Sequence, residues 1–388
     1  MTDLFDVLDI GTREESYTSL LAALLAEKPK WAREFFRQST NSDMPPKPVD
    51  IHRQPHITVS GKTAIPDLVL TFGDPASVVW VVEAKIEAHE GRDHLSEHES
   101  DEARKSLTEG LELPEDAEWH YSYMTLEGES PAEAQKFQPA SFEPLREVFT
   151  KKPSLSKEVY PAYETLRKRL RDYYKARGNK PDPESTLGEY LESGSGLISA
   201  RSKFYWMGER LAKDLKLHSA FHVTNRGGIP QCQMRDSGWQ GPLYIRASET
   251  PLKDCYDIHL EIRLYDDNVG LLLHYVTNPL MPHLKSSLSQ YNVTEKQYAE
   301  YWESRKDFAN SLKQHREALE EAGWQLSSSN NASQLARLRT DLPLDITVGE
   351  FRKAFRESAK TMRSAVNDSL DGEQSGKSAP PETEEALN

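Results

Sequence analysis

The stretch KTAIPDLVLTFGDPASVVWVVEAKIEAHEG, residues 62–91, decides the fold of the first part of the chain. It contains two short runs rich in β-branched residues, at 63–72 and 78–86, separated by a Gly-Asp-Pro sequence. Runs of this length bounded by turn residues are typical of strands. The spacing predicts two neighbouring strands that pair as a hairpin.

Three charged residues interrupt these apolar runs: Asp67 in the first, and Glu83 and Lys85 in the second. Alternate side chains of a strand share a face, so Glu83 and Lys85 should project together while Ala84 points away. A hairpin would bring Asp67 beside Glu83, and two carboxylates on one face are unfavourable unless a cation lies between them. Mg²⁺ prefers oxygen ligands, so the pattern predicts a metal site with Lys85 placed to orient or deprotonate a metal-bound water.

The alternative is that these three charges lie on the solvated face of an ordinary antiparallel hairpin. The sequence VVWVVEAKI is apolar on both faces as far as Glu83, as expected of a strand covered on both sides. Charges at the end of such a strand favour a functional site over a solvated face.

Helical and strand patterns alternate around the two runs. Thr12 is a suitable N-cap, because Glu15 follows three residues later and leucines then recur at helical spacing. The other expected elements are a loop at 41–50, a strand at 51–60 joined through Gly61-Lys62 to the strand at 63–72, a helical stretch at 92–110, a strand at 119–127 and a short helix at 141–149. This order predicts a compact α/β unit.

The second half predicts an α+β domain with a largely antiparallel sheet. Its expected elements are helices at 163–183, 198–217 and 347–366 and strands at 219–225, 242–248, 256–266 and 269–277. The expected domains are therefore 1–150, 151–345, and a segment 346–388 made of a helix and, after about residue 367, a disordered acidic tail.

Composition narrows the class of protein. A chain of 388 residues with 37% hydrophobic and 28% charged residues is typical of a two-domain globular protein. Its two cysteines, Cys232 and Cys255, are not spaced as metal ligands, and we expect a cytoplasmic protein without membrane contact or signal peptide. The net charge of −14 argues against polyanion binding over the whole surface but leaves room for a local basic groove.

Pro66-Asp67 on one strand and Glu83-Ala84-Lys85 on the next resemble the motif of the PD-(D/E)xK nuclease superfamily. The fuller resemblance is to a bacterial subfamily that opens with an acid-bearing, leucine-rich helix; here EESYTSLLAALL places Glu14 at the acidic position and Thr18 at the hydroxyl position. The sequence at 121–149 resembles the family's later strand, loop and closing helix. The resemblance covers about residues 12–150 and implies a restriction-endonuclease-like core, a mixed sheet flanked by helices.

The resemblance also implies a function. Asp67, Glu83, Lys85 and Glu14 would be catalytic, and Mg²⁺ or Mn²⁺ would be bound by the three carboxylates and the Ala84 carbonyl. The expected activity is phosphodiester hydrolysis in a bacterial phage-defence or restriction system, by a homodimer or with a partner protein. DNA is the favoured substrate, and RNA cleavage is an alternative that the sequence does not separate from it. The alternative is a non-catalytic module that uses the same fold to bind nucleic acid or protein. Glu15 remains an alternative to Glu14.

The chain departs from the family on the helix after the E-x-K motif. Where the family often has Gln-Leu, two residues, then Tyr, this chain has His94-Leu95-Ser96-Glu97-His98. His94 and His98, one helical turn apart, could contact a phosphate or assist proton transfer. They could equally be exposed polar positions, or could bind zinc together with His89.

The most basic stretch of the chain is a second candidate for nucleic-acid contact. It begins with Lys168, Arg169 and Arg171, and after two tyrosines it continues with Lys175 and Arg177. Such a helix suits backbone phosphates, although an ordinary solvated basic helix has the same composition.

Overall fold

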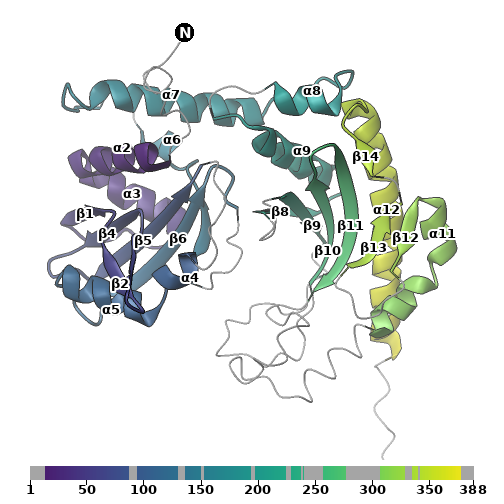
Figure 1. Cartoon of the computed structure of the whole chain (residues 1–388), viewed down its shortest axis with the longest axis horizontal. Coiled ribbons are helices and arrows are strands. Elements are labelled where there is room, and N and C mark those ends of the chain that lie inside the picture. The colour runs from purple at the N-terminus through teal and green to yellow at the C-terminus, as the bar shows by residue number, and fades with distance from the viewer. Residues whose placement is uncertain are drawn as a thin grey trace, which may run out of the picture. The chain divides into compact units, whose positions relative to one another are not determined.

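The structure of the chain is a computed structural model that describes residues 14–86, 94–129, 136–149, 153–193, 197–223, 229–236, 239, 257–276, 306–327, 334–339 and 341–376. Figure 1 labels its elements where there is room. Contacts divide the chain into two compact units. Unit 1 comprises Met1–Asp182, Gly188–Met207 and Ala220–Gln231, and unit 2 comprises Pro183–Leu187, Gly208–Ser219 and Cys232–Asn388. The domain boundaries expected at 150 and 345 stay a prediction, although the basic helix expected in the second domain belongs by its contacts to unit 1.

A five-stranded mixed sheet forms the centre of the described part of unit 1. Its strand order is β1-β4-β5-β6-β7. The strands are β1 (Val49–Arg53), β4 (Leu68–Phe72), β5 (Val78–Lys85), β6 (Glu118–Thr125) and β7 (Gln138–Ser141). β1, β4 and β5 pair antiparallel, whereas β6 and β7 continue the sheet in parallel. This arrangement, with helices on both faces, confirms the predicted α/β class.

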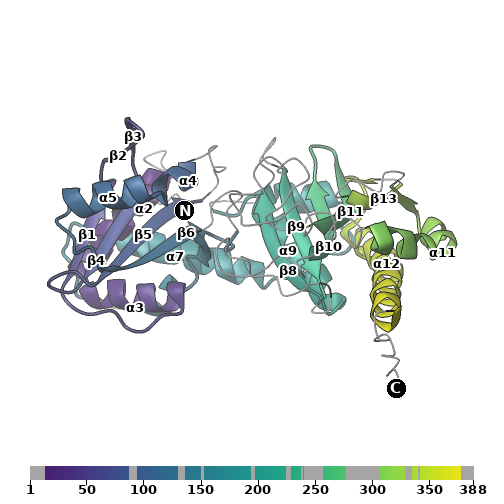
Figure 2. The ribbon, with the colours of Figure 1, turned by 90° about the horizontal axis from the view of Figure 1, so that it is seen from below.

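Each face of this sheet has its own apolar core, and Figure 2 shows helices on both sides. Trp80, Val82 and Ala84 of β5 join the core made with α2 (Glu14–Glu27), α3 (Pro29–Thr40), α6 (Leu145–Val148) and α7 (Tyr160–Arg177). Val79 and Val81 join the other core, under α4 (His94–His98), α5 (Asp101–Gly110) and a small hairpin. β5 is therefore covered on both sides, as its apolar sequence predicted.

The hairpin of β4 and β5 forms as predicted, with Leu68 opposite Val82 and Phe72 opposite Val78. Its turn requires glycine, since Gly73 has a φ of +100° and a Cβ there would lie 2.9 Å from the Pro75 carbonyl oxygen.

Two strand predictions before this hairpin were wrong in their extent. The segment expected at 51–60 divides into β1 and β2 (Ile57–Val59), and that expected at 63–72 divides into β3 (Lys62–Ala64) and β4. β2 and β3 form a separate two-stranded sheet whose turn residues, Ser60 and Gly61, have φ of 49° and 76°. Pro55 and Pro66 lie at the two breaks, where a residue without an N–H cannot continue a strand ladder.

The helical stretch expected at 92–110 is also divided. α4 ends at His98, and α5 begins after Ser100, whose hydroxyl accepts a hydrogen bond from the Ala103 N–H at 3.1 Å. A serine N-cap starts a new helix direction at this point. Residues 92 and 93 lie outside the described residues.

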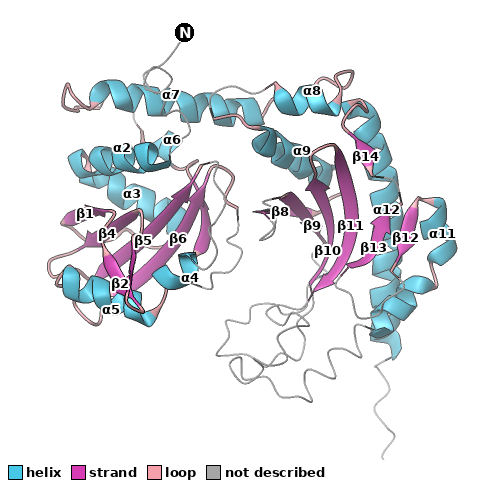
Figure 3. Ribbon diagram, viewed as in Figure 1, coloured by secondary structure: helices cyan, strands magenta, loops and turns pink. Residues whose placement is uncertain are grey.

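Most of the second sheet belongs to unit 2, although its residues 220–223 and 230–231 are assigned to unit 1 by their contacts. Its strands, like those of the first sheet, are magenta in Figure 3. The described strands run in the order β12-β13-β11-β10-β9-β8, and β14 pairs with β11. Their bounds are β8 (His218–Val223), β9 (Pro230–Arg235), β10 (Asp257–Leu264), β11 (Asn268–Val276), β12 (Trp324–Leu326), β13 (Gln334–Leu338) and β14 (Leu342–Pro343). The pairings of β11 with its neighbours and of β12 with β13 are antiparallel, as predicted. The strand expected at 242–248 lies outside the described residues.

Helices of the second half include α8 (Leu187–Glu192), α9 (Ala200–Asp214), α11 (Arg316–Glu321) and α12 (Val348–Gly376), and residues 306–313 are also helical. α9 approaches the sheet closely at Gly208, where a Cβ would lie 2.5 Å from the Cys232 sulfur. α12 is longer than predicted, so the expectation of disorder from residue 367 was wrong as far as Gly376. Asn367 accepts a hydrogen bond from Trp239 Nε1 at 2.7 Å, and Ser369 is buried, so packing extends the helix.

Candidate functional site

The three residues of the predicted site lie on adjacent strands. Leu68 is opposite Val82 in the hairpin, so Asp67, one residue earlier, reaches the level of Glu83. The Asp67 Oδ2 atom accepts a hydrogen bond from the Ala84 backbone N–H at 2.9 Å. Lys85 Nζ donates to Glu83 Oε1 at 2.8 Å. The structure therefore brings together the aspartate of the first strand and the Glu-Ala-Lys of the second.

Strand alternation places this group under α4 and α5. Val79 and Val81 face that side of the sheet, so Glu83 and Lys85 continue the same row, and Val69 marks the same side for Asp67. Side-chain exposure falls to 1% for Glu83 and is 13% for Lys85. A carboxylate this deep is stable only with a partner, and Lys85 supplies one.

His98, on α4, provides a second contact to the buried carboxylate. Its Nδ1 atom lies 3.5 Å from Glu83 Oε2, and its side chain is 0% exposed. Glu83 thus lies between Lys85 on its own strand and His98 on the covering helix. The possibility that His98 is an exposed polar position is wrong; the signal in the sequence was its spacing from Leu95, which is buried in the same core.

The described residues do not place the other predicted members of the site. The side chains of Glu14 and His94, and all of His89, lie outside the described part, so their roles stay predictions. α2, which carries Glu14, packs against the face of the sheet opposite Glu83 and Lys85. The zinc hypothesis for His89, His94 and His98 likewise stays a prediction.

A buried ion pair supports the chain just after Lys85. Thr125 of β6 is the register partner of Lys85, and its hydroxyl accepts from the Glu129 N–H at 2.8 Å. Arg201 of α9 lies 3.4 Å from the Glu129 carboxylate and donates to the Ile86 carbonyl at 3.3 Å. Burial raises the pKa of Glu129, although the Arg201 charge opposes the shift. Sequence reasoning missed this pair, because neither residue stands in a recognisable motif.

Glu127, two residues before Glu129, holds two helices to the end of β6. Its Oε1 atom accepts hydrogen bonds from the Tyr173 hydroxyl and, at 2.5 Å, from Trp206 Nε1. Its Oε2 atom lies 3.4 Å from Arg177. Burial and the Glu127 charge raise the pKa of Tyr173 well above its ordinary value, so the phenol remains a donor. Trp206 is buried in the core.

The donor set suits a hard divalent cation. Asp67, Glu83 and the Ala84 carbonyl offer the oxygen ligands that Mg²⁺ and Mn²⁺ take, and Mg²⁺ often binds through one or two carboxylates while keeping several waters. Within the described ranges, no three His, Cys, Asp or Glu side chains form a group able to hold a metal ion. A complete site would need a further ligand from Glu14, water or substrate.

The basic helix divides into an outer and an inner face. Lys168 and Arg171 are exposed and line an open hollow of about 210 Å³ with Arg167, Glu164 and Thr165. Arg169, in contrast, is buried, and its Nη1 donates to the Tyr17 hydroxyl at 2.9 Å. Arg169 therefore ties α7 to α2. The exposed basic side chains of the helix include Lys168, Lys175 and Arg171, which pairs with Asp172.

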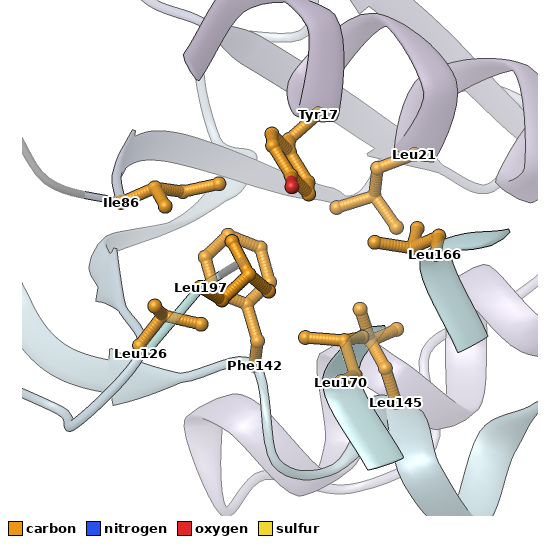
Figure 4. Close-up of a pocket in the computed structure, with 9 residues that line it drawn as sticks. All are labelled: Tyr17, Leu21, Ile86, Leu126, Phe142, Leu145, Leu166, Leu170 and Leu197. Atoms are coloured by element: carbon orange, nitrogen blue, oxygen red, sulfur yellow. The ribbon is translucent and has the colours of Figure 1, made fainter. Parts of the chain in front are cut away.

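An apolar void lies close to the end of β5 (Figure 4). Its volume is about 10 Å³, and it is lined by Tyr17, Leu21, Ile86, Leu126, Phe142, Leu145, Leu166, Leu170 and Leu197. A void of this size barely admits one water, and an apolar lining gives that water no partners. It is a packing gap between α2, α7 and the sheet, and not a ligand site.

No protein-family model, curated protein or solved structure matches this chain. Every helix in the described ranges is too short or too polar to span a bilayer.

Proposed function

We propose that unit 1 is a metal-dependent nuclease of the PD-(D/E)xK superfamily that hydrolyses phosphodiester bonds of DNA. One observation carries the proposal. Asp67 is hydrogen-bonded to the Ala84 N–H, so the aspartate lies beside the Glu-Ala-Lys segment at the ends of two adjacent strands. Acidic, partly buried side chains beside a lysine at the ends of adjacent strands support the proposal, because perturbed charged groups of this kind are typical of functional sites.

Asp67, Glu83 and the Ala84 carbonyl would hold the cation, with Glu14 as a predicted further ligand. When bound, Mg²⁺ would supply a nucleophilic water and stabilise charge on the phosphate. Lys85, 2.8 Å from Glu83, would orient the attacking water or stabilise negative charge that develops in the transition state. His98 would hold the Glu83 carboxylate in place from the side opposite Lys85.

A second candidate is a non-catalytic module that binds nucleic acid or a protein partner. The Lys85–Glu83 ion pair favours it to the extent that it neutralises the buried carboxylate without a metal. The two candidates differ in whether the carboxylates bind a divalent cation. Participation in phage defence or restriction, assembly as a homodimer and a partner protein rest on the resemblance alone.

The test is incubation of the full chain with supercoiled plasmid, single-stranded DNA and RNA in the presence of Mg²⁺, Mn²⁺ or EDTA. We expect cleavage of DNA with either metal and none in EDTA. Glu83→Gln, purified in parallel, controls for a contaminating nuclease. Equal cleavage by this variant, or no cleavage of any substrate with either metal, would contradict the proposal.

A further inference from the structure

Unit 2 carries a separate cluster of polar side chains on one face of its sheet. The cluster comprises Gln233 and Arg235 of β9, His259, Glu261 and Arg263 of β10, and His274 of β11. Strand alternation puts the three β10 residues on one face, whereas Ile258, Leu260 and Ile262 point to the other face, where they are fully buried.

Glu261 contacts one arginine of the cluster directly and the other through Gln233. Arg263 Nε donates directly to Glu261 Oε1. Arg235 Nη2 donates to Gln233 Oε1 at 2.6 Å, and Gln233 Nε2 in turn lies 3.5 Å from Glu261 Oε2. Two guanidinium groups on neighbouring strands are thus held by side-chain contacts, one to Glu261 and one to Gln233. Fixed guanidinium groups lose little conformational freedom when they bind an anion.

Two histidines complete the cluster. His259 and His274 are direct partners across β10 and β11, and their rings stack with centroids 5.4 Å apart and planes at 9°. The Nε2 atoms of the two rings lie 3.5 Å and 4.0 Å from the Glu261 oxygens. Glu261 therefore faces three basic side chains at close range.

The charge of the cluster favours an anion over a metal ion. Glu261 is the single acid among two arginines and two histidines, so the cluster carries net positive charge even with both histidines neutral. Arg263 Nε already engages the Glu261 oxygen that a cation would need, and the described residues contain no group arranged as a metal site. Burying polar and charged side chains costs free energy, so a cluster in which His259 and Glu261 are both buried points to a role beyond stability.

We propose that this cluster is a phosphate-binding site of unit 2. Arg263, whose side chain is 24% exposed and which bonds to described residues through Nε alone, presents its two Nη groups for bidentate contact with phosphate oxygens. Arg235 and His274 are the further donors, and Glu261 with Gln233 holds them in position. The phosphate belongs to a nucleic-acid backbone or to a free nucleotide. The proposal does not depend on the nuclease assignment of unit 1.

The test is calorimetric titration of the full chain in EDTA with inorganic phosphate, a nucleoside triphosphate and a short single-stranded DNA. Sodium chloride at matched ionic strength serves as the blank. We expect phosphate to bind, and Arg263→Gln and Arg235→Gln to weaken its binding at least tenfold. Arg263→Lys keeps the charge but loses the fork, so it should retain part of the affinity. Tighter binding of DNA or of the nucleotide identifies the source of the phosphate.

Arg316→Gln is the matched control. It removes one charge from an exposed arginine of α11 that pairs with Glu320, and it should bind phosphate as the parent does. Thermal melts verify that each variant is folded. If Arg263→Gln does not fold, the titration of the parent protein against the chloride blank tests whether the cluster binds phosphate, and Arg235→Gln tests the residue assignment. Heat equal to the chloride blank, or equal affinities for the Arg263, Arg235 and Arg316 variants, would overturn the proposal.

Discussion

The Asp67 carboxylate is hydrogen-bonded to the backbone N–H of Ala84, with 2.9 Å between Oδ2 and N. This bond ties the residue just before β4 to the middle of the Glu-Ala-Lys segment, so the positions of Glu83 and Lys85 are fixed relative to Asp67. Because the bond uses one carboxylate oxygen and a main-chain donor, substitutions at Asp67 can separate its structural role from its charge.

Asp67→Asn should abolish cleavage while leaving the fold intact. The asparagine Oδ1 can still accept from the Ala84 N–H, so the free energy of unfolding should change little, whereas loss of the anionic ligand should slow hydrolysis at least 100-fold, or about 2.7 kcal/mol. Asp67→Ala removes the acceptor as well and should cost about 1 kcal/mol of stability. Urea unfolding and plasmid cleavage measure the two effects. An Asn variant as active as the parent would remove Asp67 from the catalytic set.

Lys85→Met should make stability depend on divalent cations. Without the ammonium group, the Glu83 carboxylate loses its ion-pair partner in a site where its side chain is 1% exposed. Breaking such a pair costs about 3–5 kcal/mol. Ca²⁺ bound by Asp67 and Glu83 should restore part of this stability, since a ligand that binds only the folded state stabilises it.

Thermal melts with Ca²⁺ and with EDTA measure this recovery, and Glu83→Gln is the control that should show none. Single-turnover cleavage in Mg²⁺ by Lys85→Met should be slower by two or more orders of magnitude. If the melting temperatures of both the parent and Lys85→Met are the same with Ca²⁺ as with EDTA, the result would argue for the non-catalytic module.

His98→Gln should slow the chemical step without weakening DNA binding. His98 is fully buried and faces Glu83 Oε2 at 3.5 Å, so its expected role is to position that carboxylate. Misplacement of a ligand should reduce the single-turnover rate at saturating DNA by about 10- to 100-fold. DNA affinity measured in Ca²⁺ should stay at the parental value. Equal losses in affinity and rate would indicate a general loss of structure instead.

Substitutions at exposed positions of the basic helix should change the salt dependence of DNA binding, whereas a substitution at its buried arginine should change stability. Lys168→Gln combined with Arg171→Gln should weaken DNA binding and flatten its dependence on salt, because both side chains are exposed beside one hollow. Arg169→Met should leave the salt dependence unchanged. It removes the donor to the buried Tyr17 hydroxyl and should cost about 1–3 kcal/mol in unfolding. A salt slope unchanged in the double variant would leave α7 as ordinary solvated surface.

The sequence predicted those features that depend on local pattern. Alternating and continuous apolar runs with a glycine turn were sufficient to predict the hairpin of β4 and β5. The hairpin in turn predicted that Asp67 lies beside Glu83. The breaks at Pro55 and Pro66 were also visible in the sequence, since neither residue can donate to a ladder. The predicted strands ran through both prolines because apolar residues continued on either side.

Features that depend on tertiary packing were beyond the sequence. The spacing of His98 from Leu95 indicates the buried side of the helix, but nothing local shows that His98 meets Glu83 there, or that Arg169 turns inward to Tyr17. The alternation of His259, Glu261 and Arg263 with apolar residues is typical of a strand with one solvated face, yet His259 and Glu261 are buried. The Glu129–Arg201 pair joins residues 72 positions apart in the numbering, a contact that only the fold creates.

Glu261 should make the protein sensitive to acid in a defined pH range. Burial alone would raise the pKa of this carboxyl, but the hydrogen bond from His259 and the charges of His274 and Arg263 outweigh burial and lower the pKa from 4.5 to about 2. A carboxyl with a lowered folded-state pKa stabilises the protein above its unfolded pKa and loses that contribution as the pH falls through the folded one. The contribution, about 3 kcal/mol at most, should therefore be complete above pH 4.5 and decline towards pH 2.

Glu261→Gln should lower the free energy of unfolding at neutral pH and lose less of it between pH 4.5 and pH 2 than the parent does. Urea unfolding across this range measures both quantities. Glu320→Gln is the matched control, because Glu320 also has a lowered pKa, caused first by its hydrogen bond from Arg316, but lies at the surface, where ion pairs contribute little. If the Glu261 and Glu320 variants lose stability in parallel with the parent at every pH, the carboxylate of Glu261 does not anchor the basic cluster of unit 2. Its buried ion pairs would then have no measurable effect on folding.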